Sequence, residues 1–541
     1  MASKRYHLEI QRRKGRAYGL IRSSFRKQGK VAHKTVGFLS GLALEQLRMI
    51  QATLQGRTIT VDHSQAPQVT ESKEYGASFA LLELARQLGL DRLIYSRVSE
   101  PWVKDLLALV VGRVIYAGSK LALSNRWKDT ALWELCGTEG SVKVQDHCYA
   151  PMDRLLERQR SIERGFIEKH LAGQESLVLY DITSSYVEGK YSGSQLILFG
   201  YNRDGKKGHA QVVFGLVCNA EGCPVAVEVF AGNTRDGSTV KAKIDQLRKR
   251  YGVKEVILVG DRGMITPKNF ADLKDQEGLR LISALTHQEI KDLLERKVVQ
   301  MGFFDEKQVA EVVDPSDKSI RYCLCRNPES AQRETHTRDA LMKRAAKALD
   351  QIVSRKKRAT PELIGAQVGK VLLKTRMGKL IDWNVTDGRL EWRWKKTRLN
   401  DEQALDGCYI IRTTVQAWRM DKQKVVETYK QLALVEQAFR NIKTVQLEVR
   451  PIHHKLDDRI CAHIFLCMLA YYLQWHLQKR LQPLFEADGE QAKRFWTIEN
   501  VIERLKSIRR QTITIAGVAC RIVSQPDADQ TQILNLLKIK M

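Results

Sequence analysis

Short apolar runs separated by polar turns dominate the chain between residues 177 and 285, a pattern typical of buried strands joined by tight connections. The predicted elements are, in order, a strand at 177–180, a hairpin of strands at 209–218 and 223–230, a helix at 236–252, a strand at 255–260, a helix from Pro267 and a strand at 279–285. Asp181 directly follows the first strand, and Asp261 directly follows the fourth. This region therefore predicts an α/β fold with an aspartate after each of two buried strands.

Apolar residues at helical spacing mark most of the chain on either side of this sheet. The elements expected there are helices throughout 75–170, a long basic helix at about 330–358, a hairpin at 379–396, helices at 424–443 and 457–481, a hairpin at 512–524, and, within the first 60 residues, short strands followed by a helix from about Leu42. The sheet is therefore expected to be flanked by helices, with accessory regions at both ends.

The order of the four strands predicts where the two aspartates lie. A hairpin reverses the chain twice, so the third strand runs parallel to the first. If the fourth strand packs beside the first through a right-handed crossover, Asp181 and Asp261 lie side by side at the edge where ligand sites gather. Two close carboxylates repel unless a cation lies between them, and oxygen ligands favour Mg²⁺ or Mn²⁺. The alternative is that each aspartate only caps a turn or a helix.

The helix at 424–443 offers a third acid, Glu436. Its buried stripe is formed by Leu432, Val435, Phe439 and Ile442. Tyr429, Glu436 and Lys443 follow one another at intervals of seven residues, about 10.5 Å of rise, and so form a line beside the stripe. Arg440 lies one turn from Glu436. Such a line suits a metal ion beside a DNA backbone, and the alternative is an exposed helix with a Glu436–Arg440 ion pair.

Composition and charge point to a polyanionic partner. The 541 residues are too many for one hydrophobic core, and 43 % apolar with 28 % charged residues is an ordinary folded composition. Lys and Arg number 89 against 62 acids, a formal charge of +27 that indicates nucleic acid. The first 60 residues hold 13 Lys and Arg but only 2 Glu, so we expect DNA-backbone contact there.

From the remaining composition we expect the protein to be intracellular. The longest apolar run, at 106–118, is short and carries Arg113, which indicates a core helix and no membrane span. The start of the chain has no apolar signal segment. The ten cysteines are scattered, and the pair Cys323 and Cys325 has no second pair at zinc-finger spacing, so reduced thiols are expected.

Together these residues resemble the DDE transposases of bacterial insertion sequences, in the branch with a Tyr–Arg–Glu–Lys signature on its catalytic helix. Tyr429, Glu436 and Lys443 keep the spacing of that signature, whereas Leu432 stands at the position of the Arg. Further stretches that resemble the family are 180–189, 230–239, 259–266 and 449–464.

The resemblance implies a ribonuclease H-like core, a mixed sheet flanked by helices, in which Asp181, Asp261 and Glu436 bind two Mg²⁺ ions, with Mn²⁺ as the alternative. It also implies a strand-rich insertion before the helix that carries Glu436, for which 286–405 is the candidate. The residues expected to contact DNA phosphates are Tyr429, Lys443, Arg440, Arg262, Lys206 and Lys207. The expected partners are double-stranded DNA, as terminal inverted repeats and target, and a second copy of the chain in a synaptic homodimer. The expected location is the bacterial cytoplasm, away from membranes.

The expected domain organisation has five regions. These are a basic N-terminal region at 1–70, a helical domain at 71–165, a catalytic core from 166–285 and 406–480, an insertion at 286–405 and a C-terminal region at 481–541. Other functions compatible with the sequence are a structure-specific nuclease of the same fold without strand transfer, a DNA-binding protein without catalysis, and an RNA-binding protein. The absence of a recognisable RNA-binding motif argues against the last.

Overall fold

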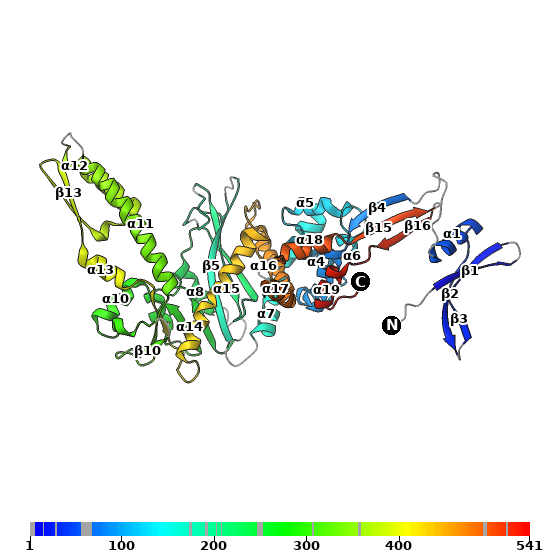
Figure 1. Ribbon diagram of the computed structural model, residues 1–541, viewed down its shortest axis with the longest axis horizontal. Helices are drawn as coiled ribbons and strands as arrows, with labels where there is room; N and C mark the ends of the chain where they lie inside the picture. Colours follow the sequence, from blue (N-terminus) through cyan, green and yellow to red (C-terminus); the bar gives the residue numbers. More distant parts are fainter. Residues whose placement is uncertain are drawn as a thin grey trace. The chain divides into compact units, whose positions relative to one another are not determined.

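The protein is described by a computed structural model that covers residues 6–541 except 14–15, 28–29, 56–67, 172–175, 190–192, 202, 207, 246–252, 306–307, 355–358, 491–494 and 516–517. The chain folds into two compact units (Figure 1). The first consists of Met1–Ala80, Arg126–Leu135 and Ala487–Met541, and the second of Leu81–Asn125 and Cys136–Glu486.

The first unit contains two small antiparallel sheets. One joins β1 (Tyr6–Arg13), β2 (Arg16–Lys27) and β3 (Lys30–Leu39), and α1 (Leu44–Leu54) packs on β1. The other joins β4 (Gln68–Glu74), β15 (Arg509–Ile515) and β16 (Val518–Val523), so the predicted C-terminal hairpin gains a strand from the other end of the chain. The other helices of this part of the chain are α2 (Gly76–Gln87), α6 (Leu132–Leu135), α18 (Ile498–Lys506) and α19 (Ala528–Leu536).

The second unit is built on an eight-stranded mixed sheet with the strand order β10-β11-β14-β9-β8-β5-β6-β7. Its strands are β5 (Ser176–Tyr186), β6 (Gln211–Cys218), β7 (Pro224–Ala231), β8 (Val256–Gly260), β9 (Leu279–Ala284), β10 (Ala310–Val313), β11 (Arg321–Arg326) and β14 (Cys408–Thr413). β8 pairs with β5 and with β9 in parallel, and the hairpin β6–β7 is antiparallel. The predicted hairpin and the parallel neighbour of the first strand are therefore confirmed.

The predicted end of the first strand is wrong, because β5 continues through Asp181 to Tyr186. The apolar run stops at Tyr180, but Ser184 and Ser185 beyond it are fully buried. The Ser184 hydroxyl accepts a hydrogen bond from the backbone N–H of Arg203, so this buried polar group has a hydrogen-bond partner. Small side chains therefore let the strand continue inside the protein after its apolar pattern has ended.

The insertion before the Glu436 helix is mainly helical, although its described residues also contain four strands, so the expectation of a strand-rich insertion is wrong. Strands β10 and β11, which lie within 286–405, extend the main sheet. The elements that follow are α11 (Pro328–Val353), α12 (Pro361–Thr375), the hairpin β12 (Ile381–Thr386) and β13 (Arg389–Trp394), and α13 (Lys396–Ala404). They enclose a core of their own that includes Leu349, Val368 and Leu380. Apolar residues at helical spacing, such as Ala345, Leu349 and Ile352, explain why helices form there.

The second unit also contains helices, several of which, such as α7, α14, α15 and α16, pack on the main sheet (Figure 1). Their bounds are α3 (Leu90–Ile94), α4 (Pro101–Ile115), α5 (Lys120–Asn125), α7 (Ala150–His170), α8 (Asp236–Asp245), α9 (Pro267–Leu273), α10 (His287–Glu295), α14 (Lys422–Lys430), α15 (Leu432–Arg440), α16 (Asp457–Arg480) and α17 (Gln482–Glu490). α16 packs against α4, α7 and β7. It is long and apolar enough to cross a membrane, but 83 % of its most apolar window is buried inside the protein, as expected of a core helix.

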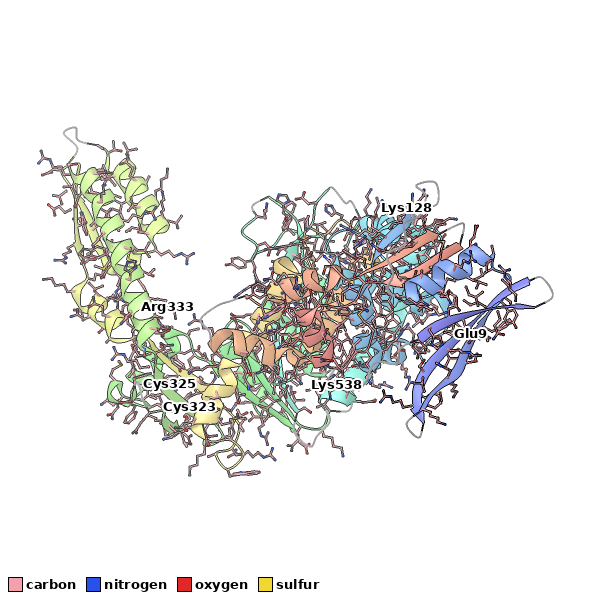
Figure 2. All side chains as sticks on the ribbon, turned by 45° about the vertical axis from the view of Figure 1, so that its right-hand side comes forward. Glu9, Lys128, Cys323, Cys325, Arg333 and Lys538 are labelled. Atoms are coloured by element: carbon pink, nitrogen blue, oxygen red, sulfur yellow. The ribbon has the colours of Figure 1, made fainter. Side chains whose placement is uncertain are left out.

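All ten cysteines of the chain are unpaired. Cys323 and Cys325 both lie on β11, and both are buried there (Figure 2). Burial raises the pKa of the Cys323 thiol to about 12, so this side chain is an inert apolar group of the sheet.

Candidate active site

Asp181, Asp261 and Glu436 line one cavity of about 430 Å³ in the second unit. Two of these acids come from the main sheet and the third from α15. The separations in sequence are large, so only the fold brings these three side chains together. The structure therefore places the glutamate-bearing helix beside the two aspartates, as the sequence predicts.

The pairing of β5 with β8 sets the positions of the two aspartates. Leu179 pairs with Val259 in this parallel register, and two residues further along the strands the same register leads to Asp181 and Asp261. The backbone N–H of Ile182 donates to Oδ1 of Asp181 at 2.7 Å, and the N–H of Met264 donates to Oδ1 of Asp261 at 2.7 Å. Each carboxylate is therefore held in orientation by the backbone next to it.

Helix α15 presents Glu436 to the cavity by packing its apolar side on the sheet. Val435 is fully buried, and the ring of Phe439 meets Phe214 of β6 edge-on with 5.7 Å between their centroids. Glu436, Arg440 and Lys443 all line the cavity, and spacings of four and three residues place them on one face of the helix and of the π-helical turn that follows it.

The single helix predicted at 424–443 is two helices, because α14 ends at Lys430 and α15 begins at Leu432. Tyr429 therefore belongs to a different helix from Glu436. It still lies near the acids: burial raises the pKa of its phenol to about 12, Asp261 and Glu436 act in the same direction, and Arg262 opposes them.

Leu432, which stands at the signature Arg position, is only 9 % exposed and packs in the core. A side chain at this position consequently points away from the solvent side of α15. The arginines that line the cavity are Arg203, Arg440 and Arg450. Arg440 is exposed and lies one turn from Glu436, as predicted.

Asp204 is a fourth acid at the cavity, and the sequence argument missed it. Its side chain is 1 % exposed and forms ion pairs with Lys443, at 2.5 Å, and with Arg450. Lys443 also donates to the hydroxyl of Thr183 at 3.0 Å. Burial lowers the pKa of Lys443, and Asp204 opposes that effect. Asp204 follows no apolar run, so the only signal was an acidic residue between Arg203 and Gly205 in a loop.

The other predicted DNA contacts lie in loops around the cavity or outside the described residues. Arg262 is exposed and directly follows Asp261. Lys206 is exposed, and its ammonium lies 5.4 Å from the centroid of the Tyr186 ring. Lys207 is outside the described part of the chain. These contacts and those of Tyr429, Arg440 and Lys443 stay predictions.

The family model described as "Transposase DDE domain" matches residues 172–473, which is more than half of the chain. The chain belongs to this family. It is thus a DDE transposase, an enzyme of metal-dependent phosphoryl transfer that binds DNA and catalyses transposition.

Two further comparisons accompany this assignment. Among solved structures, this transposase is similar to a chain of "Cryo-EM structure of piggyBac transposase synaptic complex with hairpin DNA (SNHP)", with 8 % identity, a TM-score of 0.37 and coverage of 79 % of each chain. No curated protein matches it in sequence. The assignment of this chain to the DDE transposases therefore rests on the family match, together with the geometry of the cavity.

The donor set of the cavity fits the divalent ions that DDE transposases use. Three carboxylates offer the hard oxygen ligands that Mg²⁺ and Mn²⁺ prefer. Arg203, Arg450 and Lys443 line the same cavity and bring positive charge close to the acids. A site with acids and cations around one space can hold a cation and an anionic phosphate next to each other.

Proposed function

We propose that this transposase serves a bacterial insertion sequence and that Asp181, Asp261 and Glu436 are the ligands of two catalytic Mg²⁺ ions, with Mn²⁺ as the alternative. The observation that carries the proposal is the convergence of these three acids, distant in sequence, on one cavity. When bound, such ions activate a water or hydroxyl nucleophile and offset the charge on the leaving oxygen.

In this proposal the side chains of the cavity bind and orient the reacting groups. The three carboxylates hold the ions, and the backbone N–H groups of Ile182 and Met264 keep two of those carboxylates oriented. Arg440 and Arg262 bind phosphates next to the scissile bond. Because pre-set charges need little rearrangement during the reaction, this arrangement lowers the barrier to attack on phosphorus.

The proposed substrates are the terminal inverted repeats of the element and a target duplex. The proposed location of the protein is the bacterial cytoplasm. Tyr429, Lys443, Lys206 and Lys207 are the proposed further contacts to the DNA backbone. Because two element ends must be held together for transposition, we propose that the synaptic complex contains a homodimer. Support for DNA binding beyond the cavity comes from the formal charge of +27.

A strand-joining assay tests the proposal. Labelled duplexes that carry the DNA flanking the coding sequence are incubated with the full chain, Mg²⁺ and a target plasmid. We expect a labelled joined product that is lost with Asp181→Asn, Asp261→Asn or Glu436→Gln. Each substitution removes one charge with little change in shape, and the loss of a metal ligand is expected to reduce the rate by a factor of about 10³ or more.

Two control substitutions accompany these variants. Glu427→Gln, on the exposed side of α14, and Asp275→Asn, whose side chain is 77 % exposed, remove the same charges away from the cavity and are expected to leave joining intact. Cleaved DNA without joined product would favour the structure-specific nuclease. Full joining by all three cavity variants would show that these acids are not the metal ligands.

A further inference from the structure

A cluster of histidine and cysteine side chains lies at the opposite end of β5 from the acidic cavity. Its members are His170 at the end of α7, Cys223 in the turn between β6 and β7, and His476 on α16. His170 precedes β5, which begins at Ser176, whereas Asp181 lies in the middle of that strand. The cluster is therefore separate from the site assigned to the transposition chemistry.

The geometry of the cluster suits a single ion. One potential ligand atom from each of the three residues lies within 4.8 Å of the other two. Zinc sits at about 2.0–2.3 Å from nitrogen and sulfur ligands, so neighbouring ligand atoms of a tetrahedral site are about 3.3–3.8 Å apart. Modest side-chain rotations thus bring the three atoms to bonding positions around one ion.

The hydrogen bonding of the two histidines leaves room for a ligand. Nε2 of His476 is buried and has no hydrogen-bond partner among the described residues. Nε2 of His170 lies 2.9 Å from the hydroxyl of Tyr472, a contact that fixes the ring and leaves the second ring nitrogen for another partner. One nitrogen held by a neighbouring polar group is the usual arrangement of a metal-binding histidine.

The protonation states of the cluster also suit metal binding. Burial lowers the pKa of His170 to about 4 and that of His476 to about 3, so both imidazoles are neutral, as ligands must be. Burial raises the pKa of the Cys223 thiol, so an ion must displace its proton on binding. Lys169 and Arg480 add positive charge near the cluster, and Glu221 partly offsets it.

We propose that His170, Cys223 and His476 form a binding site for a divalent transition-metal ion of borderline softness, with zinc as the expected occupant. Two nitrogens and a thiolate are ligands that zinc prefers over Mg²⁺. Three protein ligands leave the fourth tetrahedral position to water. Because the ligands come from α7, the β6–β7 turn and α16, the ion joins two helices to the sheet and stabilises the catalytic unit.

Metal content measured on the full chain tests the site separately from the acidic cavity. The background carries Asp181→Asn, Asp261→Asn and Glu436→Gln, so these acids do not contribute. After exposure to Zn²⁺ and desalting in excess Mg²⁺, elemental analysis is expected to find about one zinc per chain. Cys223→Ser and His476→Gln are expected to lose it, whereas Cys461→Ser, also on α16, is expected to keep it.

Cobalt substitution gives a spectroscopic readout that can be measured on the unsubstituted chain itself. Co²⁺ bound to a thiolate produces a charge-transfer absorption in the near ultraviolet, which carboxylate ligands do not produce. We expect this band in the unsubstituted chain and in Cys461→Ser, and its loss in Cys223→Ser. No thiolate–cobalt band in the unsubstituted chain, or zinc retention unchanged by Cys223→Ser and His476→Gln, would overturn the site and leave the proposed transposition chemistry unaffected.

Discussion

At the scale of single residues, Asp204 holds two cations of the cavity in place. With a side chain that is 1 % exposed, it pairs with Lys443 and Arg450, and its second oxygen accepts a hydrogen bond from the backbone N–H of Tyr186 at 3.2 Å. Lys443 lines the same cavity as the acids that we propose as metal ligands. Asp204 therefore positions positive charge at the cavity and, we infer, does not itself bind the ions.

We predict that Asp204→Asn lowers the free energy of unfolding by about 3 kcal/mol, because removal of one partner leaves a buried charge uncompensated. Denaturant unfolding measures the change. The control is Asp382→Asn on the β12–β13 hairpin, whose ion pairs with Arg393 and Lys395 are half exposed and screened by water, so that the substitution should change stability far less. Equal effects of the two substitutions would contradict the positioning role of Asp204.

Lys120 is a second buried ionisable residue. Its side chain is buried and donates to Nδ1 of His463, and no acid is among the groups that act on it. Burial, assisted by Arg113, lowers its pKa to about 7. Between this value and the ordinary pKa near 10.5, the unfolded chain binds a proton that the folded chain does not. The contribution of Lys120 to stability therefore rises with pH across this window.

We predict that Lys120→Met stabilises the protein most at pH 7 and progressively less toward pH 10. The difference in the free energy of unfolding between the variant and the unsubstituted chain should shrink by about 1.4 kcal/mol per pH unit. Denaturant unfolding at a series of pH values gives this difference, in which other titrating groups cancel. A difference that does not change with pH would mean that Lys120 is charged in the folded protein throughout this range.

At the scale of elements, the two sides of α15 separate the side chains that pack in the core from those that line the cavity. The helix buries Leu432, Val435 and Phe439 on the sheet and turns Glu436 and Arg440 to the cavity. Position 432 thus belongs to the packed side of the helix. The cationic side chains that line the cavity come from other positions on α15, from the turn after it and from loops.

We predict that Leu432→Arg, which restores the signature residue, lowers the free energy of unfolding by about 3–5 kcal/mol and does not increase strand joining. The reason is that it places an unpaired charge in the core. Ala433→Arg is the matched control, because position 433 is exposed on the same helix, and it should change stability by less than about 0.5 kcal/mol. An active and stable Leu432→Arg variant would show that this side chain reaches the cavity.

The elements that the sequence predicts correctly are those in which the pattern of apolar and polar residues extends over the whole strand or helix. β8 is apolar at every position and was placed correctly, and Pro267 begins α9 as predicted. The second half of β5 was missed, because buried serines and threonines look like a polar turn. The break between α14 and α15 was also missed, because the apolar spacing continues across Gln431.

At the scale of the whole molecule, the part of the fold that escaped prediction is long-range pairing. The hydroxyl of Thr70 donates to the carbonyl of Thr512, 442 residues away, where β4 joins β15. Likewise, β11 and β14 pair across the entire helical insertion. No local periodicity specifies such partners, whereas the approach of Asp181 to Asp261 follows from the expected parallel pairing of β5 with β8.

The distribution of charge over the molecule leads to a prediction about DNA affinity. The N-terminal sheet carries exposed basic side chains on neighbouring strands, among them Arg26, Lys30 and Lys34. Each phosphate contact releases condensed counterions and adds about 0.9 to the slope of log affinity against log salt concentration. Replacing these three residues with Gln is therefore expected to weaken binding to duplex DNA of any sequence and to reduce the slope by up to about 3.

The control for this prediction is a second triple variant with the same net charge as the first. Arg296, Lys297 and Lys318 are exposed at the end of α10 and near β10–β11, and their replacement with Gln removes the same charge elsewhere. If binding responds only to total charge, both triple variants will reduce the salt slope equally, as measured by fluorescence anisotropy at several salt concentrations. A larger reduction from the N-terminal variant means that DNA phosphates contact that sheet directly, because counterion release depends on local contacts and not on the distant field, which salt screens within about 10 Å.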